Sequence, residues 1–201
     1  MLWNKRLAAL YPLMGAAAIN IAIYSSVFVR MLVDTMDDIT KWDDAEKTSN
    51  ALLCMLGLGA GEIIGSLVFG KVTDKLPFKT IIVINTITLT VGYGCLFLYG
   101  AVYDFSFYLG VLLTFAWGVQ DSGMNCLLNS VLGFQFESKT IPFSVYKFLQ
   151  SLLIFVFICI EVATKSQKSY LIYFFICYVV SMAAWLILAT QFTFKTKEEV
   201  E

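Results

Sequence analysis

Long runs of apolar residues, each ending at a group of charged residues, occupy most of this 201-residue chain. The hydrocarbon core of a bilayer is about 30 Å thick, so a helix needs about 20 apolar residues to cross it. Hydrophobic residues make up 59% of the chain and charged residues only 14%, whereas soluble domains are about a quarter charged. The chain is therefore expected to be an integral membrane protein that has the lipid bilayer as its partner and binds no nucleic acid.

The charges divide the apolar sequence into six blocks. Backbone N–H and C=O groups find no water in hydrocarbon, so each block must be helical, and the blocks are too long and continuous for barrel strands. We expect an all-α integral membrane protein in which residues 1–201 form a single six-helix transmembrane bundle. The spans are expected at residues 7–29, 50–70, 80–100, 105–132, 143–163 and 169–191.

Residues 30–49 are expected to form the one long loop, and it is acidic. It carries Asp34, Asp37, Asp38, Asp43, Asp44 and Glu46 against Arg30, Lys41 and Lys47. The spacing of the aspartates lacks the alternating ligands and the glycine of an EF-hand loop. A solvated acidic loop is therefore favoured over a cation-binding loop.

The basic residues near the span ends predict the orientation. Eight fall on one side of the bundle, namely Lys5, Arg6, Lys71, Lys75, Lys79, Lys139, Lys195 and Lys197, and five on the other, namely Arg30, Lys41, Lys47, Lys165 and Lys168. Cytoplasmic loops carry an excess of Lys and Arg. Both termini are thus expected in the cytosol, with residues 192–201 as a cytosolic tail and residues 30–49 on the opposite side.

The sequence contains no motif for catalysis, a cofactor or a metal. It has no histidine, and its five cysteines all lie in predicted spans without paired or metal-binding spacing. No nucleophile elbow, phosphate-binding glycine loop or pair of catalytic carboxylates is present. We expect a protein that is not an enzyme and that carries no cofactor.

Ionisable side chains inside the predicted spans are the first candidates for function. A charge at this depth costs about 3 kcal/mol on insertion scales and faces a cavity or a partner. The charged candidates are Glu62, Asp121, Lys147 and Glu161, and the neutral polar residues beside them are Asn20, Gln120, Asn125, Asn129 and Gln150.

Glu62 lies beside a stripe of small residues. Gly57, Gly61 and Gly65 share one helical face, which is typical of a surface that another helix approaches closely. Two hypotheses for Glu62 stay open. Its carboxylate lines a cavity and takes up a proton or a cation, or it caps neighbouring backbone and holds the adjacent charged turn.

The fourth predicted span holds the densest polar patch. Asp121 and Asn125 are one turn apart and share a face that Asn129 extends, with Gln120 adjoining it. A wet cavity or permeation lining is favoured over a purely structural hydrogen-bond network. For Lys147, one turn into the fifth span, snorkelling to the interface and pairing with an acidic group are equally supported.

The segment between the second and third spans has a characteristic pattern, in which a glycine is followed four positions later by an aspartate and then by basic residues. Gly70, Asp74, Lys75 and Lys79 form this pattern, which resembles the loop motif of the major facilitator superfamily. Pro77 stands where that family usually has glycine. Phe78 stands where it usually has a basic residue, so the motif is degenerate at its end.

Two further segments are similar to the Unc-93-like branch of that superfamily, and most closely to the subgroup called major facilitator superfamily domain-containing protein eleven. They are residues 61–70 and the region that contains residues 118–122, Asn125, residues 132–133 and residues 146–151. The resemblance places the chain with the carboxyl-terminal six-helix half. It implies one half of a major facilitator superfamily fold, with a second six-helix bundle opposite and substrate held between the two bundles.

The resemblance also implies what the parts do. The 70–79 segment would steady one state of a rocking transporter, and Glu62, Asp121 and Asn125 would help to line a path for a small solute or ion. The second bundle would come from a homodimer or from a missing amino-terminal half. The alternative is a non-transporting regulatory or structural subunit of a channel or other complex, or a truncated copy of a facilitator.

Overall fold

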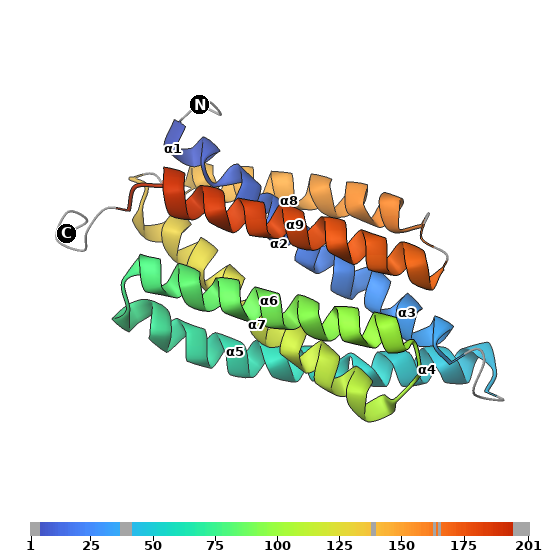
Figure 1. Ribbon diagram of the computed structural model, residues 1–201. Coiled ribbons are helices and arrows are strands. Elements are labelled where there is room, and N and C mark those ends of the chain that lie inside the picture. The colour runs from blue at the N-terminus through green and yellow to red at the C-terminus, as the bar shows by residue number, and fades with distance from the viewer. Residues whose placement is uncertain (1–4, 37–41, 138–139, 163, 165, 195–201) are drawn as a thin grey trace.

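The computed structural model describes residues 5–36, 42–137, 140–162, 164 and 166–194 of the chain. All regular secondary structure within these residues is helical, without a strand. Six long helical stretches lie side by side, and both termini lie at the same end of the bundle (Figure 1). The expected all-α class is confirmed.

The first two stretches are each built from shorter helices. The first comprises α1 (Lys5–Ala8), α2 (Tyr11–Ala22), a π-helical turn η1 (Ile23–Val27) and α3 (Phe28–Asp34), and the second comprises α4 (Asp44–Cys54) and α5 (Leu56–Lys75). The remaining helices are α6 (Phe78–Val102), α7 (Phe107–Phe134), α8 (Thr140–Glu161) and α9 (Gln167–Gln191).

Five of these stretches, all except α7, are long and apolar enough to cross a membrane. Helix α7 has the length, with 28 residues, but polar side chains interrupt its centre. It can carry them because it is packed between neighbours, with Trp117, Gly118, Gln120 and Asp121 all buried. The chain is thus an all-helical protein with the character of a membrane protein.

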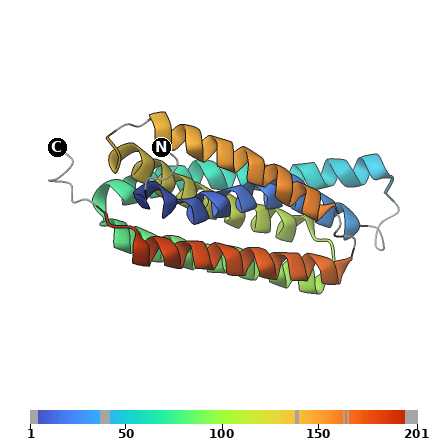
Figure 2. The ribbon, with the colours of Figure 1, turned by 90° about the horizontal axis from the view of Figure 1, so that it is seen from above.

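The helices pack as two triplets. Helix α7 lies between α5 and α6, and α2 lies between α8 and α9. Contact between α6 and α9 joins the triplets along one side, and α2 meets α7 in the centre (Figures 1 and 2). Aromatic side chains fill the interior around Trp117, whose ring meets those of Phe28 and Tyr93 edge to face, with centroids 5.2 and 5.0 Å away.

The predicted bounds of the loop, residues 30–49, are wrong at both ends, because helical residues extend into this range from each side. Helix α3 reaches Asp34, and α4 begins at Asp44. A reciprocal cap starts α4, since Asp43 Oδ1 accepts from the Glu46 N–H at 2.7 Å and Glu46 Oε2 accepts from the Asp43 N–H at 3.2 Å. Two of the acids counted toward a solvated loop are thus a helix-capping pair, whereas Asp37, Asp38 and Lys41 lie outside the described residues.

The expected turn over residues 70–79 is also shorter than predicted. Helix α5 runs on to Lys75, and only Leu76 and Pro77 separate it from α6. Proline disfavours the helical conformation of the residue before it, and Leu76 is extended, with φ −102° and ψ 154°. The helix therefore ends because of Pro77, whereas Gly70 continues it.

Candidate functional site

A polar cluster lies in the middle of the bundle, where α2 meets α7. Asn20 on α2 donates through Nδ2 to Gln120 Oε1 at 3.1 Å and to Asp121 Oδ1 at 3.4 Å. The same nitrogen lies 3.8 Å from the sulfur of Met124. All four side chains are buried. The hydrogen bonds join α2 and α7 near the middle of both helices.

The hydrogen bonds continue from α7 to α8. Asn125 Nδ2 donates to Asp121 Oδ2 at 2.9 Å, and the Tyr146 hydroxyl donates to Asn125 Oδ1 at 3.1 Å. That hydroxyl accepts from Gln150 Nε2 at 2.8 Å, and the Lys147 ammonium donates to Gln150 Oε1 at 2.9 Å. We call these side chains the central polar cluster: Asn20, Gln120, Asp121, Asn125, Tyr146, Lys147 and Gln150.

The Asp121 carboxyl group at the centre of the bundle is held by neutral amides. Asp121 is only 4% exposed, and its two carboxylate oxygens accept from the neutral amides of Asn20 and Asn125. Within the part of the chain that the structure describes, neither Asp121 nor Glu62 forms an ion pair. Lys147 bonds the Gln150 amide and lies 4.8 Å from the Tyr146 ring centroid, so it pairs with no described carboxylate.

Glu62 reaches the cluster region because α5 and α7 are in direct backbone contact. A Cβ atom at Gly57, Gly61 or Gly65 would overlap Val111, Phe115 or Ser122 of α7, in that order. The closeness is mutual, since a Cβ at Gly118 would overlap the Leu58 carbonyl of α5. The glycine stripe thus lies against α7, and it brings the half-buried Glu62 close enough to interact electrostatically with Asp121.

The π-helical turn begins at Ile23, three residues after Asn20. Its Ser26 hydroxyl donates to the Ala22 carbonyl at 2.9 Å, and its half-buried Tyr24 is within electrostatic range of Asp121 and Glu62. Single π-helical turns inside α-helices are frequent at functional sites. This turn lies at mid-depth beside the central polar cluster, and no sequence signal marked it.

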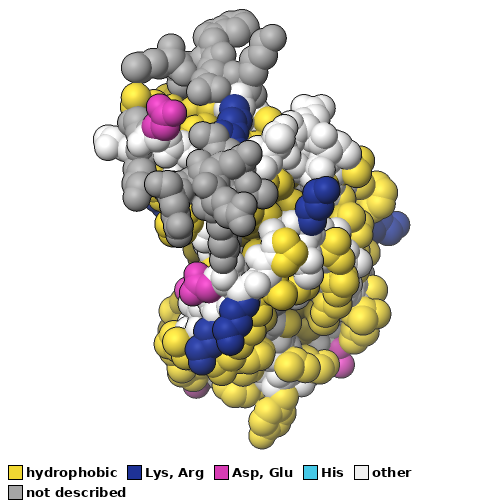
Figure 3. Space-filling model, turned by 90° about the vertical axis from the view of Figure 1, so that its left-hand side faces the viewer, with side chains coloured by type: hydrophobic (Ala, Val, Ile, Leu, Met, Phe, Trp, Pro, Cys, Tyr) yellow, Lys and Arg dark blue, Asp and Glu magenta, His cyan; other side chains and the backbone are white. Residues whose placement is uncertain are grey.

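The predicted motif residues lie away from the cluster, at the end of the bundle that bears both termini. Gly70, Asp74 and Lys75 are on the last turns of α5 and Lys79 is on the first turn of α6, in the part of the surface where Figure 3 shows Lys and Arg side chains. A Cβ at Gly70 would meet nothing within 4 Å. Within this bundle, therefore, close packing does not require the glycine.

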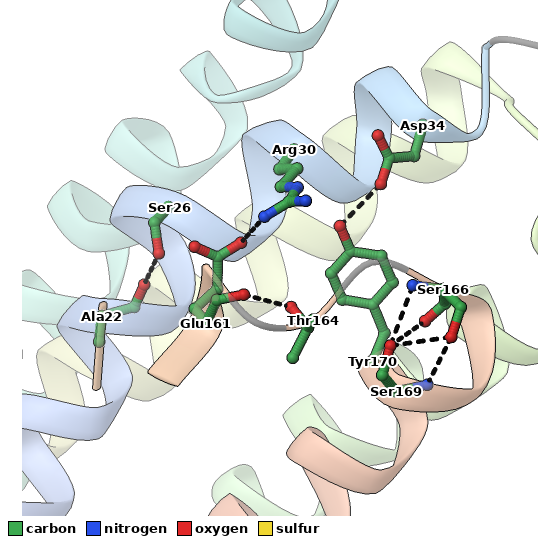
Figure 4. A network of polar contacts seen from close by, with 9 residues as sticks. All are labelled: Ala22, Ser26, Arg30, Asp34, Glu161, Thr164, Ser166, Ser169 and Tyr170. Atoms are coloured by element: carbon green, nitrogen blue, oxygen red, sulfur yellow. Dashed lines mark hydrogen bonds and ion pairs between the residues drawn. The ribbon is translucent and has the colours of Figure 1, made fainter. Parts of the chain in front are cut away.

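A second polar group at the opposite end was not predicted as a unit (Figure 4). Arg30 Nη1 on α3 pairs with Glu161 Oε1 on α8 at 3.3 Å, and the Tyr170 hydroxyl on α9 donates to Asp34 Oδ2 at 2.7 Å. Arg30 and Asp34 had been assigned to a loop. Extending the first span by five residues, to Asp34, places Arg30 and Asp34 together at its end, where acids and bases of neighbouring helices can meet.

Arg6 forms a comparable junction at the end that bears the termini. Its Nη2 donates to Gln135 Oε1 at 2.7 Å and to the Thr193 carbonyl at 3.0 Å. Its guanidinium lies 5.3 Å from the ring centroid of Phe192 and 5.8 Å from that of Phe136. Counted earlier only as a basic residue, Arg6 ties the first helix to the α7–α8 connection and to the segment after α9.

The other candidates are placed apart. Asn129 is exposed on α7 and does not share in the hydrogen bonds of the central polar cluster. Among the described residues no group of three or more Cys, Asp or Glu side chains is arranged to hold a metal ion. All five cysteines are free thiols.

Comparison of the chain with models of known protein families, with curated proteins and with solved structures finds no match.

Proposed function

We propose that this chain is a six-helix bundle of a facilitator-type membrane protein, related to the Unc-93-like branch of the major facilitator superfamily. The bundle contributes the central polar cluster to a path for a small solute or ion. A second six-helix bundle, from another copy of the chain or from an amino-terminal half, supplies the opposite wall.

The packing of the two triplets supports this fold. The first three spans correspond in order to the last three, so that α2 matches α7, α5 matches α8 and α6 matches α9. Under this correspondence the α2–α8 contact becomes the α7–α5 contact, the α2–α9 contact becomes the α7–α6 contact, and the α6–α9 contact is unchanged. The contacts that this correspondence predicts are all present in the bundle. Inverted repeats of three helices within each six-helix half are typical of facilitators. Because three is odd, the two triplets cross the membrane in opposite directions.

The unequal distribution of polar side chains at mid-depth is the observation that carries the proposal. The face formed by α2, η1, α5, α7 and α8 presents half-buried Glu62 and Asn125 with exposed Ser25, Ser66 and Lys147. The opposite face, on α6 and α9, exposes apolar side chains at the same depth, among them Val83, Ile87, Val91, Ile172, Ile176 and Val179. Charges at this depth are stable against water or protein and costly against lipid. The polar face is therefore the one that meets a second bundle or a water-filled path.

Uptake measurements test the transport function. Cells that express the chain are compared with cells that express Asp121→Asn, which keeps the size of the side chain and removes its charge. We expect uptake of at least one solute from a broad panel to fall by tenfold or more in the variant. Asp104→Asn, at an exposed acid between α6 and α7, is the matched control and should leave uptake unchanged.

One observation favours a second candidate function. Glu62 lies in an open surface depression that Ile63, Ser66 and Leu67 of α5 also line. Such a surface also suits a partner helix, as in a non-transporting subunit of a channel complex. Purification of the chain with a stoichiometric partner, with no uptake of any solute in the panel, would support this function and overturn transport.

A further inference from the structure

Ionisable groups of opposite sign lie on the two edges of the polar face. Helices α2 and α7 meet in the middle of this face, α5 lies against α7, and α8 lies against α2 (Figures 1 and 2). Half-buried Glu62 is on α5, and exposed Lys147 is on α8. One edge of the face thus carries an acid and the other a base.

The two groups lie at similar depth in the bundle. Tyr24 of η1 is within electrostatic range of both Glu62 and Tyr146. Lys147 follows Tyr146 on α8, and its ammonium lies 4.8 Å from the centroid of the Tyr146 ring. Glu62 and Lys147 are therefore both near the level of Tyr24, in the middle of the bundle.

The two groups do not meet within one chain. Among the described residues neither Glu62 nor Lys147 forms an ion pair, and the Lys147 ammonium donates instead to Gln150 Oε1 at 2.9 Å. Ionisable side chains at this depth in a membrane face water or pair with one another. A partner that brings a base to α5 and an acid to α8 would complete both edges.

The surroundings of both groups leave room for another helix. Glu62 lies in an open surface depression, and a Cβ at Gly59, one turn away, would meet nothing within 4 Å. On α8, exposed Ser144 and Ser151 lie one turn from Lys147 on either side. Small side chains let membrane helices approach closely. Each edge can therefore be approached by a helix until the charged groups meet.

A second copy of the chain supplies the required charges at both edges. Two copies of one chain insert in the same direction, so a twofold axis along the membrane normal relates them, and every contact across it occurs twice. When the polar faces are opposed about such an axis, α5 of each copy lies opposite α8 of the other. The acid on one edge then faces the base on the partner's edge.

We propose that the opposite wall is a second copy of this chain, held by two ion pairs in which Glu62 of each copy meets the partner's Lys147. The inference rests on the proposed function, because it identifies the second bundle of that path. It accounts for the opposite signs, the common depth and the lack of an ion pair for Glu62 and Lys147 within the described chain. A separate amino-terminal bundle predicts instead that copies of this chain do not associate.

Co-purification of two differently tagged copies, cross-linked in membranes before solubilisation, measures the association. We expect unaltered copies to co-purify. Glu62→Lys in both copies, or Lys147→Glu in both, places like charges opposite each other and should lower recovery of the second tag by tenfold or more. Asp104→Lys, at an exposed acid between α6 and α7, is the matched charge reversal away from the polar face and should leave recovery unchanged.

A mixed pair of variants separates an ion pair between copies from a role within one chain. When one copy carries Glu62→Lys and the other carries Lys147→Glu, opposite charges meet again at both edges. Recovery should return to the level of the unaltered chain, which also shows that both variants fold. A charge role within one chain predicts no such recovery.

Disulfide formation between copies tests the same contact with both charges in place. Helix α5 ends, and α8 begins, at the end of the bundle that bears the termini, so Gly59 and Ser151 lie on the same side of the proposed pair. In a background without the native cysteines, Gly59→Cys in one copy should cross-link to Ser151→Cys in the other. Gly59→Cys with Val179→Cys, on the opposite face, should not.

Two results would contradict the proposal. Unaltered copies that neither co-purify nor cross-link would overturn the second copy and assign the opposite wall to a separate bundle. Association that Glu62→Lys in both copies leaves unchanged, or a mixed pair no better than either variant with itself, would overturn the ion pairs.

The outcome is separable from that of the transport experiment, because association requires no movement of solute. Association without uptake would refute transport and leave the pair of copies standing. Uptake by a chain that does not associate with itself would refute the pair and leave transport standing.

Discussion

At the scale of single residues, the bundle places its charged side chains in two different situations. Arg30 and Glu161 neutralise each other near the end of their helices, with Glu161 buried and Arg30 partly exposed. Asp121 lies at mid-depth and is bonded by neutral amides alone. The first arrangement stabilises the fold, whereas the second leaves Asp121 without an ion-pair partner among the described residues.

The Arg30–Glu161 ion pair predicts how stability changes when one or both of its residues are replaced. Arg30→Met should destabilise the chain by roughly 2 kcal/mol, because it leaves the buried Glu161 carboxylate without its cation. Adding Glu161→Gln to Arg30→Met should restore part of the loss. Tm by thermal unfolding in detergent measures both effects. Lys168→Met, at an exposed lysine on the same end, is the control, and a double variant less stable than Arg30→Met would contradict the pairing.

At the scale of secondary-structure elements, the contact between α5 and α7 determines where Glu62 lies. Glycines on both helices allow backbone to touch backbone, so the carboxylate of one helix comes near that of the other. In lipid no hydrophobic effect drives helices together, and close packing of small residues supplies much of the association. A side chain in this contact should therefore disturb both the fold and the site.

Gly61 and Gly59 give a matched test of that contact. A Cβ at Gly61 would overlap the Phe115 carbonyl, whereas one at Gly59 would meet nothing within 4 Å. Gly61→Ala should lower stability by about 1 to 3 kcal/mol through overpacking. Gly59→Ala should be neutral or stabilising, because alanine favours helix over glycine. Equal Tm values for the two variants would show that α5 and α7 are not in backbone contact.

The sequence predicts the helical class and the approximate position of each span, because apolar runs of this length have one stable form in lipid. It misses helix ends that depend on local chemistry, such as the Asp43–Glu46 cap and the extended Leu76 before Pro77. It also misses partners across helices. Helical periodicity predicts that Asp121 and Asn125 share a face. The hydrogen bond from Asn20 to Gln120 joins residues 100 positions apart, and the spacing of residues along one helix cannot predict such a contact.

At the scale of the whole molecule, the two faces of the bundle suit different surroundings. The α6 and α9 face exposes mainly apolar side chains at mid-depth, with Thr90 as a polar exception, and suits lipid, whereas the face that carries Glu62 and Lys147 requires water or protein. The central claim is that this polar face lines an aqueous path. It follows that positions on the two faces at equal depth should differ in their access to water.

Labelling of single cysteines in membranes by a charged, water-soluble thiol reagent tests that claim most directly, in a background without the five native cysteines. Ser25→Cys and Ser66→Cys should react, because both positions are exposed on the polar face. Ile87→Cys on α6 and Val179→Cys on α9 should stay unmodified, because lipid covers them. Labelling confined to Ser25→Cys and Ser66→Cys is the predicted result, and four unreactive or four equally reactive positions would contradict an aqueous path along this face.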